Sequence, residues 1–262
     1  MAIIVCRMNN AEYLKLAEVE DRMWYFRSLH GHVERELTHA LPAGREARVL
    51  DAGCGTGGLI LRLREGHPTW TWSGIDFSAL ACELARQRTG GDIREASITA
   101  LPFGDGEFEA LVSADVVCQV ENAAAAAAEF FRVLRPGGLV IINVPAYRWM
   151  WSYHDDTCQT KHRYTRHEVR ALLVTAGFRG VQATHWNALP LPLIYARRKF
   201  FRSADDTSDV KLYPAPVELG FRAAMAVEHA WLRAGGRWAW GTSVFAVGRK
   251  PLAEDRVSEL AR

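Results

Sequence analysis

A glycine-rich turn between a predicted strand and a predicted helix most constrains the fold of this chain. Gly53, Gly55 and Gly57 stand at alternate positions directly after the apolar run 47–52. Glycines let the backbone turn sharply and approach a ligand closely, and the start of the next helix offers unpaired N–H groups. Asp76 ends the next predicted strand, where a carboxylate accepts hydrogen bonds from ribose hydroxyls. The turn therefore favours a site for a ligand that carries a ribose.

Strand and helix signals alternate through the first two thirds of the 262 residues. Such alternation implies a parallel sheet covered by helices on both faces. The expected strands are 47–52, 71–75, 93–96, 108–114, 139–144, 178–185 and 242–247. The first expected helix is 9–20, which Asn9 and Glu12 open as a capping box. A short helix is expected through Leu59 and Leu63, and the others are 28–41, 78–88, 121–134, 166–176 and 218–234.

The spacing of the glycines fits two kinds of cofactor site. Gly53, Gly55 and Gly58 satisfy G-x-G-x-x-G, so an NAD-linked oxidoreductase is one interpretation. The chain continues with Leu101-Pro102-Phe103 and then with Leu134-Arg135-Pro136-Gly137-Gly138-Leu139, between a predicted helix and a predicted strand. Together with Asp51-Ala52-Gly53-Cys54-Gly55-Thr56-Gly57, this ordered set resembles the class I S-adenosylmethionine methyltransferases, particularly the branch similar to the ubiquinone and menaquinone biosynthesis enzymes.

The resemblance covers roughly residues 48–176 and implies both a fold and a reaction. The fold is α/β, a doubly wound, mostly parallel seven-stranded sheet with helices on both faces, an N-terminal helical cap and a C-terminal appended helical segment. Its one antiparallel strand is expected at 242–247. The cofactor is S-adenosyl-L-methionine, whose methyl group moves to a small-molecule acceptor by in-line displacement. A non-catalytic partner that binds S-adenosylmethionine stays an alternative, because Ser97 stands where the family usually has Asp.

The resemblance also assigns cofactor contacts to individual residues. Gly53, Gly55 and Gly57 would wrap the methionine end, Asp76 would hold the ribose, and Phe77 would lie against the adenine. The other cofactor-binding candidates are Tyr25, Arg27, Asp51, Ser97, Ile98, Ala114 and Asp115. Arg27 is expected to pair with the methionine carboxylate. The structural alternative for the aromatic residues near it is that they only dock the first helices on the sheet.

The candidate catalytic segment follows strand 139–144 and should emerge at the edge where open α/β sheets bind ligands. A hydroxyl acceptor needs proton removal, which a His with a pKa of ~6.5 performs. His154 with Asp155 is the first candidate for the base, and His162 is the second. A carboxylate acceptor would need only cationic positioning, and a lid held by its own ion pairs is the structural alternative. The substrate-binding candidates are Trp149, Trp151, Arg163 and Tyr164, and no metal site is expected.

The chain is expected to divide into four parts. These are an N-terminal helical cap (1–45), a methyltransferase core (46–188) with a lid insertion at 146–165, a C-terminal substrate-side segment with the final strand (189–250), and a tail (251–262). In segment 189–202, an apolar run with two prolines lies directly before a basic cluster. It predicts either a weak contact with a membrane surface or a buried connector.

Composition narrows the classes of function. The 32 basic and 30 acidic residues leave a formal net charge of +2, which gives no support for nucleic-acid binding. Five widely spaced cysteines without a C-x-x-C pair indicate a reducing compartment. A signal-peptide pattern and an apolar run of ~20 residues are both absent, so a cytoplasmic location is expected. Nine Trp residues favour an apolar or ring-bearing acceptor. The methylated atom is expected to be oxygen, and the oligomeric state is not predicted.

Overall fold

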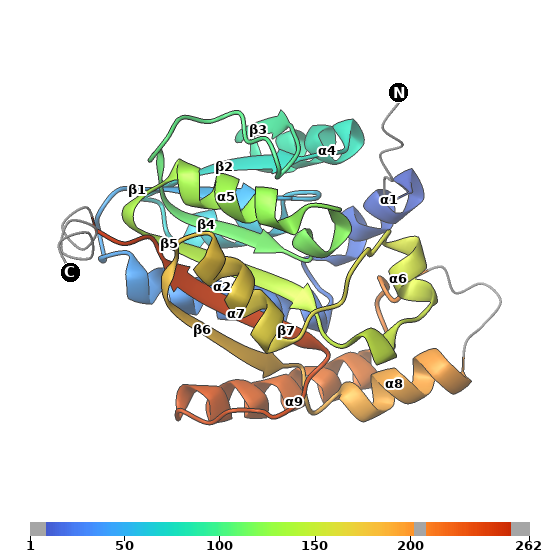
Figure 1. Cartoon of the computed structure of the whole chain (residues 1–262). Helices are drawn as coiled ribbons and strands as arrows, with labels where there is room; N and C mark the ends of the chain where they lie inside the picture. The colour runs from blue at the N-terminus through green and yellow to red at the C-terminus, as the bar shows by residue number, and fades with distance from the viewer. Residues whose placement is uncertain (1–8, 202–207, 253–262) are drawn as a thin grey trace.

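A seven-stranded sheet forms the centre of the molecule, which a computed structural model describes over residues 9–201 and 208–252 (Figure 1). The strand order is β3-β2-β1-β4-β5-β7-β6. Strands β1 to β5 pair in parallel, and β7 pairs antiparallel with both β5 and β6. The strands are β1 Ala47–Ala52, β2 Trp70–Asp76, β3 Asp92–Glu95, β4 Phe108–Ala114, β5 Leu134–Pro145, β6 Arg179–Trp186 and β7 Ser243–Arg249. The predicted doubly wound, mostly parallel fold is confirmed, and β7 covers the predicted antiparallel strand except for its first residue.

Helices cover both faces of this sheet. They are α1 Asn10–Val19, α2 Trp24–Ala40, α3 Gly58–Gly66, α4 Ala79–Thr89, α5 Ala123–Val133, α6 Tyr153–Thr157, α7 Arg166–Thr175, α8 Leu191–Phe200 and α9 Ala215–Arg233, with 3-10 turns η1 Val117–Gln119 and η2 Arg148–Met150. Successive strand side chains point to opposite faces, so Val49 of β1 packs in the layer of α2 and α3, while Leu50 packs in the layer of α5 and α7. Ile141 and Ile142 of β5 divide in the same way.

Local capping explains where several helices begin. The Ser78 side chain accepts a hydrogen bond from the Ala81 N–H and starts α4, and Thr165 forms a capping box with Glu168 at the start of α7. At α1 the Asn9 side chain accepts from the Ala11 N–H. The predicted capping box with Glu12 is absent there, because the Glu12 carboxylate instead accepts from Lys15 and from the hydroxyl of distant Ser208.

Two segments form helices that the sequence pattern did not predict. The segment 146–165, expected as an aromatic lid, forms η2 and the short helix α6. The apolar run after Leu189 forms α8, on which no residue is buried, so it is not a buried connector. None of the described helices is both long and apolar enough to cross a bilayer. Cys6, Arg202 and residues 253–262 of the predicted tail lie outside the described residues.

Gly53 shows why the first turn after β1 needs glycine. Its φ is 97°, in the left-handed region, and a Cβ atom there would lie 2.2 Å from Cγ2 of Val116. Its N–H and that of Cys54 both donate to the Ile75 carbonyl oxygen, at 2.8 Å each. The turn is therefore held against the end of β2 with no room for a side chain.

We expect Gly53→Ala to lower the free energy of unfolding by about 3 kcal/mol or more, because the added Cβ meets both strain and a clash. The matched control is Gly180→Ala, where φ is 60° but no atom lies within 4 Å of the added Cβ. Backbone strain alone should cost that variant about 1 kcal/mol. Urea unfolding of both variants measures the difference, and equal losses would contradict the packing argument.

Candidate functional site

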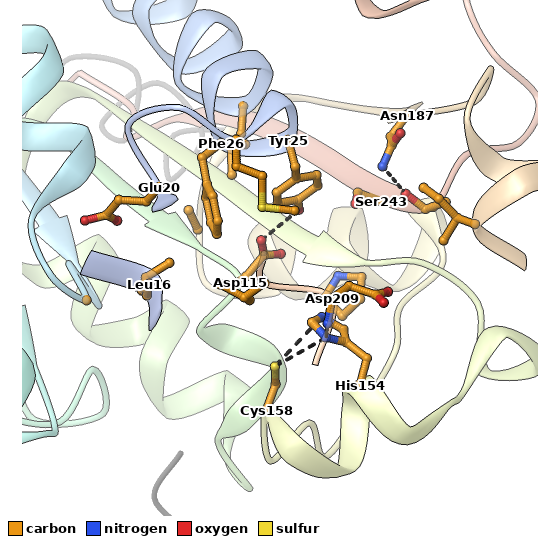
Figure 2. A pocket seen from close by; sticks show the side chains of 18 of the residues that line it. Leu16, Glu20, Tyr25, Phe26, Asp115, His154, Cys158, Asn187, Asp209 and Ser243 are labelled. Carbon is orange, nitrogen blue, oxygen red and sulfur yellow. Dashed lines mark hydrogen bonds between the residues drawn. The ribbon is translucent and has the colours of Figure 1, made fainter. Parts of the chain in front are cut away.

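A cavity of about 600 Å³ opens where strands β1, β2 and β4 end. Its wall begins at the glycine turn, passes the end of β4 and continues to α6, α8 and α9 (Figure 2). In the strand order, β1 lies between β2 and β4, so the chain crosses to opposite sides of β1 at this point. Ligands of open α/β sheets bind at such switch points. The topology therefore places the glycine turn inside the cavity wall.

The Asp76 carboxylate organises the end of the cavity beside the glycine turn. One oxygen accepts the Gly55 N–H at 3.0 Å, and the other accepts the Ser78 N–H at 2.9 Å and the Tyr13 hydroxyl at 3.2 Å. Burial is the main cause that raises its pKa, and these donors oppose the shift. The hydroxyl of Tyr13 thus occupies one of the positions at which a ribose hydroxyl would bind Asp76.

Asp51 lies beside this group in an acidic environment. Burial raises its pKa to about 8, and the charges of Glu20 and Asp76 add to the effect. Glu20 itself accepts hydrogen bonds from the Thr56 hydroxyl and from Arg88. Asp51 lines the cavity and is held among acids, so a cation entering there would stabilise its ionised form.

The Asp115 carboxylate lies across the cavity, at the end of β4. It accepts the Tyr25 hydroxyl at 2.8 Å and the Asn143 amide N–H at 2.8 Å. The Trp186 indole N–H donates to the Asn143 side-chain oxygen at 2.7 Å, which fixes the orientation of that amide. Asp115 has a φ of 60°, rare for a residue with a side chain. Burial raises its pKa to about 6.

The predicted catalytic pair, His154 and Asp155, lines the cavity, but the two side chains serve different partners. Asp155 accepts Arg163 at 2.7 Å through one oxygen and the Ser152 N–H at 2.9 Å through the other. Nδ1 of His154 accepts the backbone N–H of Asp209 at 3.2 Å. Burial lowers the pKa of His154 to about 4, and its ring lies 3.8 Å from the Cys158 sulfur (Figure 2).

The structure brings seven of the predicted site residues besides His154 and Asp155 to the cavity wall. These are Tyr25, Asp51, Gly53, Gly55, Asp76, Ala114 and Asp115, and Arg163 joins them from the substrate-binding set. Nine others lie outside the lining of this cavity: Arg27, Gly57, Phe77, Ser97, Ile98, Trp149, Trp151, His162 and Tyr164.

Local contacts account for several of these positions. Ile98 and Tyr164 are buried in the apolar layer below α5 and α7. The Ser97 hydroxyl shares a hydrogen bond with Thr99 at 2.8 Å, and His162 bonds Glu168 at 3.1 Å on the surface. The Trp151 indole N–H donates to Asp156 at 2.9 Å. The ligand roles assigned to all predicted site residues stay predictions.

Sequence reasoning missed residues that come from distant elements. Tyr13, Leu16 and Glu20 all line the cavity. They stand at i, i+3 and i+7 along and just past α1, which is the spacing of one helix face. That periodicity was a usable signal, although it does not say what the face covers. Asn143 and Asp209 carried no sequence signal, since each acts through a contact made only in the folded chain.

A glycine turn, an acid at the end of β2 and a cavity at the β1–β4 switch point are the features of a cofactor site on an open α/β sheet, and similarity to known proteins gives the class of enzyme. The family model described as "Methyltransferase domain" matches residues 50–142. The malonyl-[acyl-carrier protein] O-methyltransferase of Enterobacter lignolyticus is 30% identical over 172 residues, which are 62% of this chain and 67% of that protein.

Two further comparisons agree with this class. The ubiquinone/menaquinone biosynthesis C-methyltransferase of Desulfotalea psychrophila is 35% identical over 94 residues, 35% of this chain and 38% of that protein. A solved S-adenosylmethionine-dependent methyltransferase of Thermotoga maritima, described as a possible histamine N-methyltransferase, has a TM-score of 0.58 at 18% identity and covers 92% of this chain and 95% of its own. That likeness concerns the fold.

The chain belongs to the class I S-adenosylmethionine-dependent methyltransferases, in the branch of the ubiquinone and menaquinone biosynthesis enzymes. Its cofactor is S-adenosyl-L-methionine. The residues present fit this molecule, because the acids around Asp51 suit its ammonium group and Asp76 suits its ribose. The NAD-linked alternative is therefore not favoured.

We expect Asp76→Ala to weaken S-adenosylmethionine binding about tenfold or more, because the variant removes an acceptor for the ribose hydroxyls. Isothermal titration measures the affinity. The control is Asp92→Ala, whose carboxylate binds Arg94 on the exposed strand β3. Unchanged affinity in Asp76→Ala would place the ribose elsewhere.

We expect cofactor binding at pH 7 to release up to about one proton. Asp51, with its pKa raised to about 8, is mostly protonated at pH 7 before the cofactor binds. A bound ammonium group lowers that pKa, so the proton leaves. Titration in buffers of different ionisation enthalpy counts the protons, and Asp51→Asn should abolish most of the release. Equal proton release by wild type and Asp51→Asn would contradict the assignment.

Proposed function

We propose that this enzyme methylates a hydroxyl oxygen of a small, apolar or ring-bearing acceptor. The acceptor end of the cavity supports the apolar character, because most of its wall is hydrophobic. The lining there includes Trp24, Phe26, Leu193, Ile194, Val210 and Phe221. The E. lignolyticus relative is named as an O-methyltransferase, which supports oxygen as the methylated atom; the choice of a hydroxyl over a carboxylate rests on the residues below. S-adenosylmethionine supplies a sulfonium-bound methyl group, and displacement in line with the sulfur requires the acceptor to be held in alignment.

The Asp115 carboxylate is the observation that carries this proposal. A hydroxyl must lose its proton as the C–O bond forms and the C–S bond breaks, and a nearby carboxylate with a pKa of about 6 is ionised at neutral pH and takes it. Tyr25 and Asn143 hold the carboxylate by its two oxygens. Each carboxylate oxygen has a second lone pair, so Asp115 keeps capacity for the acceptor hydroxyl.

His154 suits a different role from the one its sequence position suggested. A nitrogen that accepts a backbone N–H carries no proton, so Nδ1 is the unprotonated nitrogen and Nε2 carries the hydrogen of the neutral ring. With a pKa of about 4, the ring stays neutral through the physiological range. We assign His154 as a hydrogen-bond donor at the cavity wall, and the proton acceptor is Asp115.

The arginines at the acceptor end favour a hydroxyl over a carboxylate acceptor. Arg163 pairs with Asp155 at 2.7 Å, with both side chains almost fully buried. Arg197 and Arg198 pair with Asp209 at 3.2 Å and 2.6 Å. A carboxylate acceptor would need a cation to hold it, and each of these three arginines already pairs with an acid, with Arg197 and Arg198 sharing Asp209.

We also propose that residues 1–45 act as a cap over the core and that residues 189–250 form its acceptor side.

The direct test supplies S-adenosylmethionine with a ¹³C-labelled methyl group and a panel of ring-bearing acceptors. The panel pairs each hydroxyl compound with its amine and carboxylic acid counterparts. Carbon NMR of the product identifies the atom that carries the label. Transfer to hydroxyl compounds supports the proposal, and transfer confined to amines or carboxylic acids would overturn it.

We expect kcat/KM to fall as the pH drops through about 6, because protonated Asp115 cannot accept the hydroxyl proton. Asp115→Asn should lower turnover by about 10²–10⁴-fold and remove that acidic limb of the profile. The control is Asp105→Asn, whose exposed carboxylate binds Arg132 far from the cavity. An unchanged pH profile in Asp115→Asn would exclude Asp115 as the base.

A further inference from the structure

Three large apolar residues both line the cavity and reach the surface. Leu193 of α8 is 59% exposed, Phe201 directly after α8 is 74% exposed, and Val217 of α9 is 40% exposed. A side chain that belongs to a cavity wall and to the outer surface marks the rim of an opening. The cavity mouth therefore lies between α8 and the start of α9.

Further apolar side chains extend this rim outward. Phe200 is 73% exposed and Leu219 is 67% exposed, each within two residues of a rim residue. In Figure 1, α8 and α9 lie together along one border of the molecule, away from β3. Exposed apolar side chains gathered around a cavity mouth mark a site of interaction. We call Leu193, Phe200, Phe201, Val217 and Leu219 the apolar rim.

The segments that carry the apolar rim are cationic. Residues 189–201 and 208–222 hold five basic side chains against two acidic ones, although the whole chain is nearly balanced. The basic residues are Arg197, Arg198, Lys199, Lys211 and Arg222, and the acidic residues are Asp209 and Glu218. Glu218 is directed inward, where it accepts the N–H groups of Trp24 and Tyr213. Arg197 and Arg198 share Asp209 and are mostly buried, so the exposed cations around these apolar side chains are Lys199 and Arg222. Such cations complement an anionic lipid headgroup layer.

We propose that the apolar rim docks the enzyme on an anionic lipid bilayer, with the cavity mouth facing the membrane. The side chains of Phe200, Phe201 and Leu193 enter the boundary between headgroups and acyl chains. Helix α8 has ten residues, about 15 Å of helix, so it lies in the interface and does not span it. The docking itself needs neither cofactor nor acceptor. The consequence for access rests on the proposed function, because an apolar acceptor would pass from the bilayer directly into the cavity.

Vesicle sedimentation with the full chain tests the docking without knowledge of the acceptor. The vesicles are phosphatidylcholine alone, or phosphatidylcholine with a third phosphatidylglycerol. We expect binding to the phosphatidylglycerol vesicles that falls with added salt, and a loss on the order of tenfold in Phe200→Ser/Phe201→Ser. The matched control is Val227→Ser/Trp240→Ser, which removes two exposed apolar side chains outside the rim, 63% and 55% exposed.

Each outcome decides the proposal. Equal binding by both double variants, or no binding of wild type to either vesicle, would overturn it. Light scattering behind a sizing column provides a second measurement on the same proteins. A wild-type dimer that only the Phe200→Ser/Phe201→Ser variant loses would assign the rim to a second copy of the chain and overturn the membrane proposal. Cofactor affinity unchanged in both variants shows that they fold.

Discussion

The Asp76 carboxylate is the contact on which the cofactor end of the molecule depends. It joins three segments that are separate in the chain, through the N–H of Gly55, the N–H of Ser78 and the hydroxyl of Tyr13. A buried carboxylate is costly unless donors surround it, so these three contacts offset its desolvation. They also hold the glycine turn, the start of α4 and the cap helix α1 around one point. A cofactor that binds Asp76 therefore acts on all three segments at once.

Buried acids also hold the structure together at the proposed acceptor end of the cavity. Asp155 holds Arg163, and Glu228 of α9 accepts the backbone N–H groups of Asn187, Ala188 and Leu189 just before α8. Asp155 and Glu228 are almost fully buried beside their donors, so they serve the structure. Asp115 also has a donor on each oxygen, but it is partly exposed in the cavity, which leaves it accessible to a ligand. The distinction separates the acid proposed for chemistry from the acids that shape the wall.

The two ends of the cavity are assembled from different parts of the sequence. The cofactor end is built within the first 90 residues, from α1, the glycine turn and β2. The acceptor end combines α2, the end of β4, α6, α8 and α9. Because α8 contributes to the wall without burying any residue of its own, it lies as a partial cover over the core. This arrangement places the apolar rim, the mouth and the acceptor chamber in one continuous path.

The sequence by itself determined the sheet, the glycine turn and the family, because these depend on local patterns. Short apolar runs buried on both faces specify β1 and β5, and Gly53 is required where φ is positive and no Cβ fits. Only the tertiary structure decided what Asp115, His154 and Asp155 do. Asp115 contacts Tyr25 and Asn143, and His154 contacts the backbone of Asp209, all at least 28 residues away in the chain. Asp155 contacts Arg163 only eight residues on, across the loop after α6. Burial sets the pKa values of Asp115 and His154, and it is not encoded in residue spacing.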